Sequence, residues 1–430
     1  MIYLMSLAVG NCYGRLKSSL YDPFYKNAFF MVMNKGLGVV SGFVFWALAA
    51  RFYTVNEVGN AVVLISAASL IIAFSMMGFD ISLVRFFHHY DKNKVFNTSL
   101  VVMVSTAFLV GVLYVVAVKY VAPDQAWLQS PVYALIFLLY IVLSAIGLVN
   151  SQTFIAMRDA RYTFFQNVLY CSKIPLLFFL TFMGFFGIFS ANVFSYVIAF
   201  LFVLLILNKF VKVDLHVDME YIKKAFRTSS RNYVASILYN AAFLTVPIII
   251  SMQLGEADAA IYYMAFTVGN FLLQIPISLS TSFFVEGVYG ESLRKNFIKA
   301  ALTVYSILVP AAVFFFLFGG FILSLFGPGY VAGADLLNLV VISSFLYTLY
   351  SMFIPVLNIR MNVNTIIVLN AILFSVLLGL TWPLTGMFGI NGFGYALILT
   401  FLAVDAAILF FAWRWKWIWP APATHYLSDA

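Results

Sequence analysis

The sequence predicts an all-α, polytopic membrane protein with about 12 transmembrane helices arranged as two six-helix lobes. Hydrophobic residues make up 64% of the 430-residue chain, charged residues make up 9%, and the mean hydropathy is +1.00. A soluble domain is about half apolar and about a quarter charged. The apolar segments are roughly 20 residues long, which suits a membrane-spanning helix and is too long for a strand of a membrane barrel.

Uninterrupted apolar length places the helices along the chain. The first lobe (29–208) has spans at 29–52, 58–79, 97–118, 131–154, 162–183 and 187–208. The second lobe (232–413) has spans at 232–253, 259–283, 299–326, 335–358, 363–386 and 390–413. A cytoplasmic or interfacial segment (1–28) precedes the first lobe, and a cytoplasmic tail (414–430) follows the second.

Residues 209–231 form a polar linker between the lobes. Its apolar residues Met219, Ile222, Ala225 and Phe226 fall at helical spacing, opposite Lys223, Lys224 and Arg227. This pattern predicts a short amphipathic helix. It lies either on the cytoplasmic leaflet or in solvent as an ordinary linker helix.

The basic residues predict the orientation of the chain. With these boundaries, all 24 Lys and Arg residues except three fall on one side of the membrane. The exceptions are Arg51 and Lys119, on the opposite side, and Lys173, inside a span. Positive charge concentrates in cytoplasmic segments, so both termini are expected in the cytoplasm. The same placement argues against nucleic acid as a partner.

The two halves repeat short motifs. Phe186-Gly187-Ile188 and Phe388-Gly389-Ile390 are 202 residues apart, and Arg158 and Arg360 have the same spacing. Because each half contains six spans, such repeats run in the same direction and are related by an axis along the membrane normal. The two cysteines, Cys12 and Cys171, offer no disulfide framework or Cys-rich metal site.

Several motifs carry a resemblance to a known family. They are Asn34-Lys35-Gly36-Leu37-Gly38, Glu57-Val58-Gly59, Gly78-Phe79-Asp80, Ile261-Tyr262-Tyr263-Met264-Ala265, Gly327-Pro328-Gly329-Tyr330 and Gly389-Ile390-Asn391-Gly392. In this order they resemble the polysaccharide-transport (Wzx-type) branch of the multidrug/oligosaccharidyl-lipid/polysaccharide (MOP) exporter superfamily, from about residue 27 to 415. The family's prolines at the start of span seven and the end of span eight are absent, which leaves the gating geometry open.

The resemblance implies a flippase of the inner (cytoplasmic) cell membrane with a MATE-like V shape. Such a protein moves a polyprenyl-diphosphate-linked oligosaccharide to the outer leaflet by alternating access, for cell-surface polysaccharide synthesis. The expected partners are the lipid-linked oligosaccharide, membrane lipids and other polysaccharide-assembly proteins. No cofactor is expected, and proton or sodium coupling stays open.

Charged residues within spans are the first candidates for binding the diphosphate, because each is costly in hydrocarbon. Lys173 lies midway along span five, near Pro175, and is a candidate diphosphate ligand; the alternative is a structural lysine paired with a carboxylate or carbonyls. Lys35 is a candidate head-group contact and Arg51 a candidate outer-gate residue, although Lys35 can instead extend to the interface and Arg51 can anchor a hairpin.

The remaining candidates are weighed against structural roles. Asp405 in span twelve is a candidate coupling-ion or gate residue, or a satisfied interhelical carboxylate. Asp80 and Arg85 form a cap or local ion pair, or close an inner gate. Asn270 and Gln274 are four residues apart and share a helix face. They bind sugar hydroxyls or make interhelical hydrogen bonds.

Two other functions share some of these features. A cation-coupled multidrug antiporter has the same architecture, but it usually places a carboxylate in the first lobe, where span one has Lys35. A membrane-embedded polysaccharide polymerase or glycosyltransferase usually needs a large outer loop, and the outer loops here are short. The sequence therefore favours a transporter over an enzyme.

Overall fold

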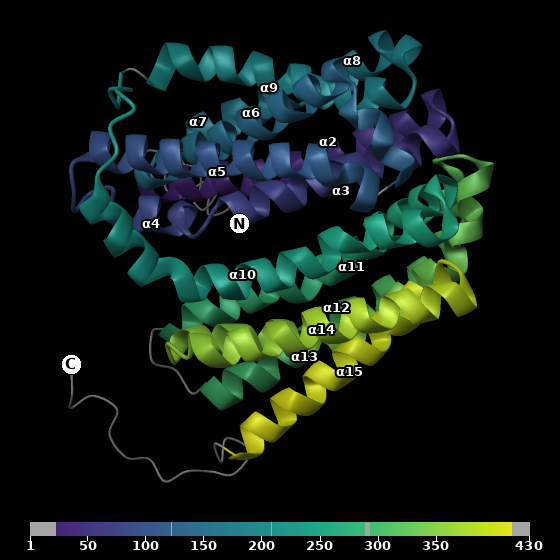
Figure 1. Cartoon of the computed structure of the whole chain (residues 1–430). Coiled ribbons are helices and arrows are strands. Elements are labelled where there is room, and N and C mark those ends of the chain that lie inside the picture. The colour runs from purple at the N-terminus through teal and green to yellow at the C-terminus, as the bar shows by residue number, and fades with distance from the viewer. Residues whose placement is uncertain (1–22, 122, 208, 289–292, 415–430) are drawn as a thin grey trace, which may run out of the picture. The chain divides into compact units, whose positions relative to one another are not determined.

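The computed structural model describes residues 23–121, 123–207, 209–288 and 293–414 (Figure 1). Throughout these residues the regular elements are α-helices and short 3-10 helices, without strands. Eleven of the helices are long and apolar enough to cross a membrane. The chain is therefore a multi-pass membrane protein. The predicted segments 1–28 and 414–430 fall largely outside the described residues.

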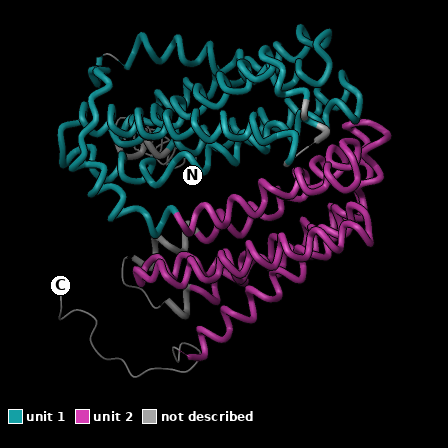
Figure 2. Tube along the Cα trace, viewed as in Figure 1, with its two compact units in different colours: residues 1–233 teal, residues 234–430 magenta. Residues whose placement is uncertain are grey.

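The chain forms two compact units, Met1–Tyr233 and Val234–Ala430 (Figure 2). The first contains α2 (Pro23–Phe52), α3 (Val55–Ser75), α4 (Phe79–Phe86), α5 (Lys92–Val121), α6 (Pro131–Ala156), α7 (Ala160–Tyr170), α8 (Lys173–Phe179) and α9 (Phe185–Leu207), with 3-10 turns at Pro123–Gln129 and Thr181–Met183. Helix α10 (Met219–Leu254) crosses the boundary. The second contains α11 (Glu256–Val288), α12 (Leu293–Ser324), α13 (Ala334–Ile359), α14 (Val363–Phe388) and α15 (Asn391–Arg414), with a 3-10 turn at Pro328–Gly333.

The predicted fifth span, 162–183, is not a continuous helix. It is divided into α7, α8 and the following 3-10 turn. Pro175 has no N–H for the Cys171 carbonyl, and that carbonyl instead accepts from the N–H of Ile174 at 3.0 Å. The proline thus accounts for a break in hydrogen bonding that apolar length could not reveal.

The two units share a backbone feature ahead of their last helix. Gly184 before α9 has φ 57° and ψ −143°, and Gly389 before α15 has φ 59° and ψ −146°. A Cβ on Gly187 or on Gly392 would lie 2.1 Å from a carbonyl oxygen of the preceding segment. The equivalent glycines are therefore Gly184 with Gly389 and Gly187 with Gly392. The predicted pairing of Gly187 with Gly389 was wrong by three residues, although the repeat itself is visible in the backbone.

Aromatic packing forms the core of the first unit. Phe137 of α6 stacks on Phe189 of α9, with ring centroids 6.0 Å apart, and both side chains are fully buried. In the second unit, Gly269 allows α11 to approach α13, because a Cβ there would lie 2.5 Å from Val340. Close packing of this kind replaces the hydrophobic driving force that is missing between helices in lipid.

Candidate functional site

Lys173 lies at the first residue of α8, directly after the break in the fifth span. Its side chain is half-buried, and its Nζ lies 4.7 Å from the centroid of the Phe45 ring on α2, a cation–π contact. Within the described part of the chain, no carboxylate forms an ion pair with it. The alternative predicted for Lys173 was pairing with a carboxylate or with carbonyls, and the carboxylate pair is not found among these residues.

Helix α2 runs parallel to the α7–α8 segment, and contacts continue along both. Phe30 contacts Phe164 with centroids 5.7 Å apart, and the Asn167 amide donates to Asn34 Oδ1 at 2.6 Å. Near the other end, the Tyr53 hydroxyl donates to the Leu177 carbonyl at 2.8 Å. Burial, and to a smaller extent the charge of Glu57, raises the pKa of Tyr53 to about 12.

This pairing places the three predicted cationic residues of the first unit along one helix pair. Lys35 is exposed beside Asn34, and Arg51 is exposed in the last turn of α2. Phe45, which contacts Lys173, is ten residues beyond Lys35, about 15 Å along the helix axis. The cations therefore follow α2 as a series and do not converge on one point.

Asp80 and Arg85 lie on the short helix α4, which begins after Gly78 in a left-handed conformation (φ 82°). They make no ion pair with each other, so the predicted local pair is not present in this part of the structure. Burial raises the pKa of Asp80, and backbone N–H groups at the helix start oppose that shift. Helix α4 is held to α10 by Ser82, whose Oγ lies 2.6 Å from Ser229 Oγ.

In the second unit, the predicted polar residues lie on two helices. Asn270 is half-buried and Gln274 is exposed, one turn apart on α11. Asp405 on α15 is half-buried, and its Oδ1 is buried without a hydrogen-bond partner among the described residues. A buried carboxylate oxygen without a partner is costly, so this atom favours binding a proton or a cation.

A tyrosine cluster in the second unit was not predicted. The Tyr350 hydroxyl donates to Asn370 Oδ1 at 2.6 Å, and the Asn370 amide donates to the Ala235 carbonyl at 2.7 Å. The hydroxyls of Tyr239 and Tyr347 lie 3.2 Å apart. The spacing of Tyr347 and Tyr350 on one helix face was the available sequence signal.

The linker is a second polar site, in which residues 209–218, here called the strap, lie against the start of α5. Asn97 is fully buried, and its amide donates to the Lys212 carbonyl at 2.8 Å. Its Oδ1 accepts from the N–H groups of Asp214 and Leu215 at 3.1 and 3.2 Å. Asn93 Oδ1 accepts from the N–H of Lys212 at 3.0 Å. Side chains of α5 thus satisfy the strap's backbone.

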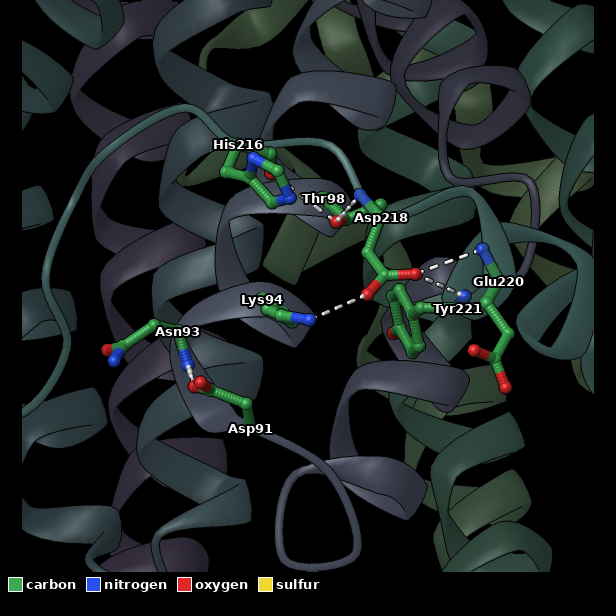
Figure 3. A network of polar contacts seen from close by, with 8 residues as sticks. All are labelled: Asp91, Asn93, Lys94, Thr98, His216, Asp218, Glu220 and Tyr221. Carbon is green, nitrogen blue, oxygen red and sulfur yellow. Dashed lines mark hydrogen bonds and ion pairs between the residues drawn. The ribbon is translucent and has the colours of Figure 1, made fainter.

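Asp218 ends the strap and caps α10 (Figure 3). Its carboxylate accepts from the N–H groups of Glu220 and Tyr221 at 2.9 and 3.0 Å and pairs with Lys94 at 3.4 Å. Its own N–H donates to Thr98 Oγ1 at 2.9 Å. The Tyr221 N–H, followed by smaller contributions that include Lys94, lowers the pKa of Asp218. A side-chain oxygen that accepts hydrogen bonds from backbone N–H groups in this way is a common cap at the start of a helix.

The predicted amphipathic helix is the first part of α10, continuous with the seventh span. Tyr221 and Ala225 are buried, and the Tyr221 ring meets Phe79 and Phe86 of α4 edge-on. Met219 and Phe226 are exposed. Of the predicted apolar face, Ala225 is therefore covered by protein, whereas Met219 and Phe226 stay exposed; whether they meet the cytoplasmic leaflet stays a prediction.

The helical architecture defines the chain as a multi-pass protein with a MATE-like fold. A MATE multidrug resistance transporter of the MOP superfamily, in an inward-facing conformation, matches with a TM-score of 0.70 and 16% identity, covering 88% of this chain and 96% of that one. The lipid II flippase MurJ matches with a TM-score of 0.68 and 12% identity, covering 91% and 87%. A MOP superfamily transporter from Pyrococcus furiosus matches with a TM-score of 0.58 and 15% identity, covering 93% of this chain and 97% of that one.

Sequence comparison gives the family. The sequence model of the family described as polysaccharide biosynthesis protein matches residues 24–284, more than half of the chain. The chain belongs to this family. The comparison with curated proteins found no match. The predicted resemblance is confirmed for family and fold, while the roles of the individual site residues stay predictions.

Proposed function

We propose that this protein is a flippase that moves a polyprenyl-diphosphate-linked oligosaccharide from the inner to the outer leaflet by alternating access. The match to the polysaccharide biosynthesis family over residues 24–284 carries the proposal. The MATE-like fold supports a transporter and not an enzyme. We further propose that the protein lies in the cytoplasmic membrane with both termini in the cytoplasm, as the distribution of basic residues predicts.

Lys173 is the proposed diphosphate ligand. It is half-buried, has no ion-pair partner in the described residues, and lies at a helix break where backbone groups are less constrained. A cation held only by an aromatic ring can exchange that contact for an anion, because hydrogen bonds to charged groups are among the stronger ones in proteins. Lys35 and Arg51 would extend the cationic series along α2.

The test is transbilayer movement of a polyprenyl-diphosphate oligosaccharide in proteoliposomes, with and without a proton or sodium gradient. Movement above that in protein-free vesicles supports the proposal. No movement, together with ion-driven efflux of a cationic dye, would replace it with the second candidate, a cation-coupled multidrug antiporter. The unpartnered Oδ1 of Asp405 favours ion coupling in either case, so Asp405→Asn should remove gradient dependence.

A further inference from the structure

An apolar groove lies on the first unit between α5, α6, α9 and the strap. Its volume is about 490 Å³, and apart from Ser105 and Asn150 its lining is apolar. It extends along α5 from Phe96 to Phe108, about 18 Å at the rise of an α-helix. This is close to the hydrocarbon depth of one leaflet, roughly half of 30 Å. We propose that the groove binds an acyl chain of an anionic phospholipid from the leaflet on the strap side.

The strap provides one wall of this groove. Val213 and Leu215 line the groove although they are 42% and 63% exposed, and Leu215 is held in a left-handed backbone conformation (φ 56°). These residues follow the end of α9 and lie beside the first turns of α5, where we place the boundary between membrane and water. Apolar side chains gathered there favour a lipid chain as their cover.

Charge near the mouth of the groove suits a phosphate. Lys209 and Lys212 are exposed on the strap, and a basic residue near a membrane surface attracts anionic lipid. The two neighbouring carboxylates are already engaged: Asp214 Oδ1 accepts from the N–H of His216 at 3.0 Å, and Asp218 caps α10. These carboxylates keep their charge, but Lys94 of α5 pairs with Asp218. Three lysines (Lys94, Lys209 and Lys212) thus face two carboxylates (Asp214 and Asp218), and the remaining positive charge favours an anionic head group.

Asn150 adds an independent indication that the ligand carries polar atoms. It lines the groove and is 2% exposed, and its Oδ1 has no hydrogen-bond partner among the described residues. It lies six residues before the end of α6 at Ala156, about 9 Å along the axis, near the boundary of head groups and hydrocarbon. An unpartnered amide oxygen is an acceptor, so the polar atom that it favours in the ligand is a donor, such as a glycerol hydroxyl of a phosphatidylglycerol head group.

The experiment uses the full-length protein, delipidated in detergent and titrated with palmitoyl-oleoyl phosphatidylglycerol or phosphatidylcholine during native mass spectrometry. We expect one tightly retained phosphatidylglycerol. Replacing both strap lysines, with Lys209→Gln and Lys212→Gln, should reduce the preference over phosphatidylcholine by about 30-fold, the effect of two surface lysines. Equal affinity of the unaltered protein for the two lipids would overturn the proposal.

Groove variants locate the bound lipid. Leu204→Trp fills the groove and should lower occupancy, whereas Leu113→Trp, at a position on α5 that is 66% exposed and outside the groove lining, should not. Leu215→Ser alters an exposed side chain and should weaken binding without unfolding the protein. Unchanged occupancy in Leu215→Ser and in folded Leu204→Trp would place the lipid elsewhere and refute this site. The test does not involve transport, so its outcome is separate from that of the flippase proposal.

Discussion

Asn97 holds the strap in place, and replacing it with leucine should release the strap. The two side chains are similar in shape, so Asn97→Leu removes polar atoms with little change in packing. The wild-type amide makes three hydrogen bonds to strap backbone, to the Lys212 carbonyl and to the N–H groups of Asp214 and Leu215. Because the asparagine is fully buried, leucine leaves these groups unpaired while the strap stays docked.

The expected magnitude follows from these bonds. A hydrogen bond contributes about 1 kcal/mol net, so three together make about 3 kcal/mol. That free energy corresponds to roughly a 150-fold change in a local opening equilibrium. Since backbone amides exchange through such openings, the amide hydrogens of the strap should exchange faster by up to this factor, while those of distant helices keep their rates.

Hydrogen exchange with mass spectrometry on peptides that cover the strap is the measurement. The matched control is Asn60→Leu, because the Asn60 amide bonds only to the Asn56 carbonyl of its own helix, at 3.4 Å. The control should leave strap exchange unchanged. If folded Asn97→Leu protein shows wild-type exchange across the strap, the anchoring role inferred for Asn97 is wrong.

Three further predictions concern transport, packing and pH. Lys173→Gln should lower the rate of flipping in proteoliposomes by about 10- to 100-fold, which corresponds to the free energy of one hydrogen bond to a charged group. Lys173→Arg should retain most of the rate, and equal rates for Lys173→Gln and wild type would refute the role. Gly187→Ala should lower the melting temperature in detergent, because its Cβ would clash with a carbonyl oxygen. Gly379→Ala, whose Cβ meets no atom within 4 Å, should be neutral or slightly stabilising. A lower melting temperature for Gly379→Ala than for Gly187→Ala would contradict the packing. The pKa of Asp218 is lowered in the folded state, so its stabilisation is complete above its unfolded pKa of about 3.9 and is lost as the pH falls through the folded value. The protection of the strap amides, taken relative to their intrinsic exchange rate at each pH, should therefore fall in acid, and Asp218→Asn should remove that pH dependence.

Hydrophobic length was sufficient to place most of the spans. The fourth was predicted at 131–154 and is observed at Pro131–Ala156, and the twelfth was predicted at 390–413 and is observed at Asn391–Arg414. Each depends on a local property, because a helix in lipid must satisfy its own backbone over the thickness of the bilayer. The break at Pro175 has the same local origin, and the proline was its only signal.

The contacts of the strap could not be predicted in this way. Asn97 and Asp214 are 117 residues apart in sequence, and nothing local to either residue indicates the other. The alternation of Val211, Val213, Leu215 and Val217 with polar residues does indicate an extended segment with two faces. This alternation does not predict that the backbone of the strap is hydrogen-bonded to α5, or that apolar residues of the strap border a groove.

The anchoring of the strap has a consequence for the proposed alternating-access cycle. Asn97 and Thr98 hold the strap to α5, Ser229 holds α10 to α4, and the Tyr233 hydroxyl donates to the Phe74 carbonyl at 2.8 Å. All of these contacts lie within the first unit, which ends at Tyr233. The linker that the sequence sets apart from both lobes is therefore held to the first unit along its length. The next residues of α10 are held within the second unit, where the Ala235 carbonyl accepts from the Asn370 amide and the hydroxyls of Tyr239 and Tyr347 lie 3.2 Å apart. A change in lobe orientation would therefore have to be absorbed close to Tyr233 and Val234, where a few backbone dihedral angles of α10 separate the two sets of contacts.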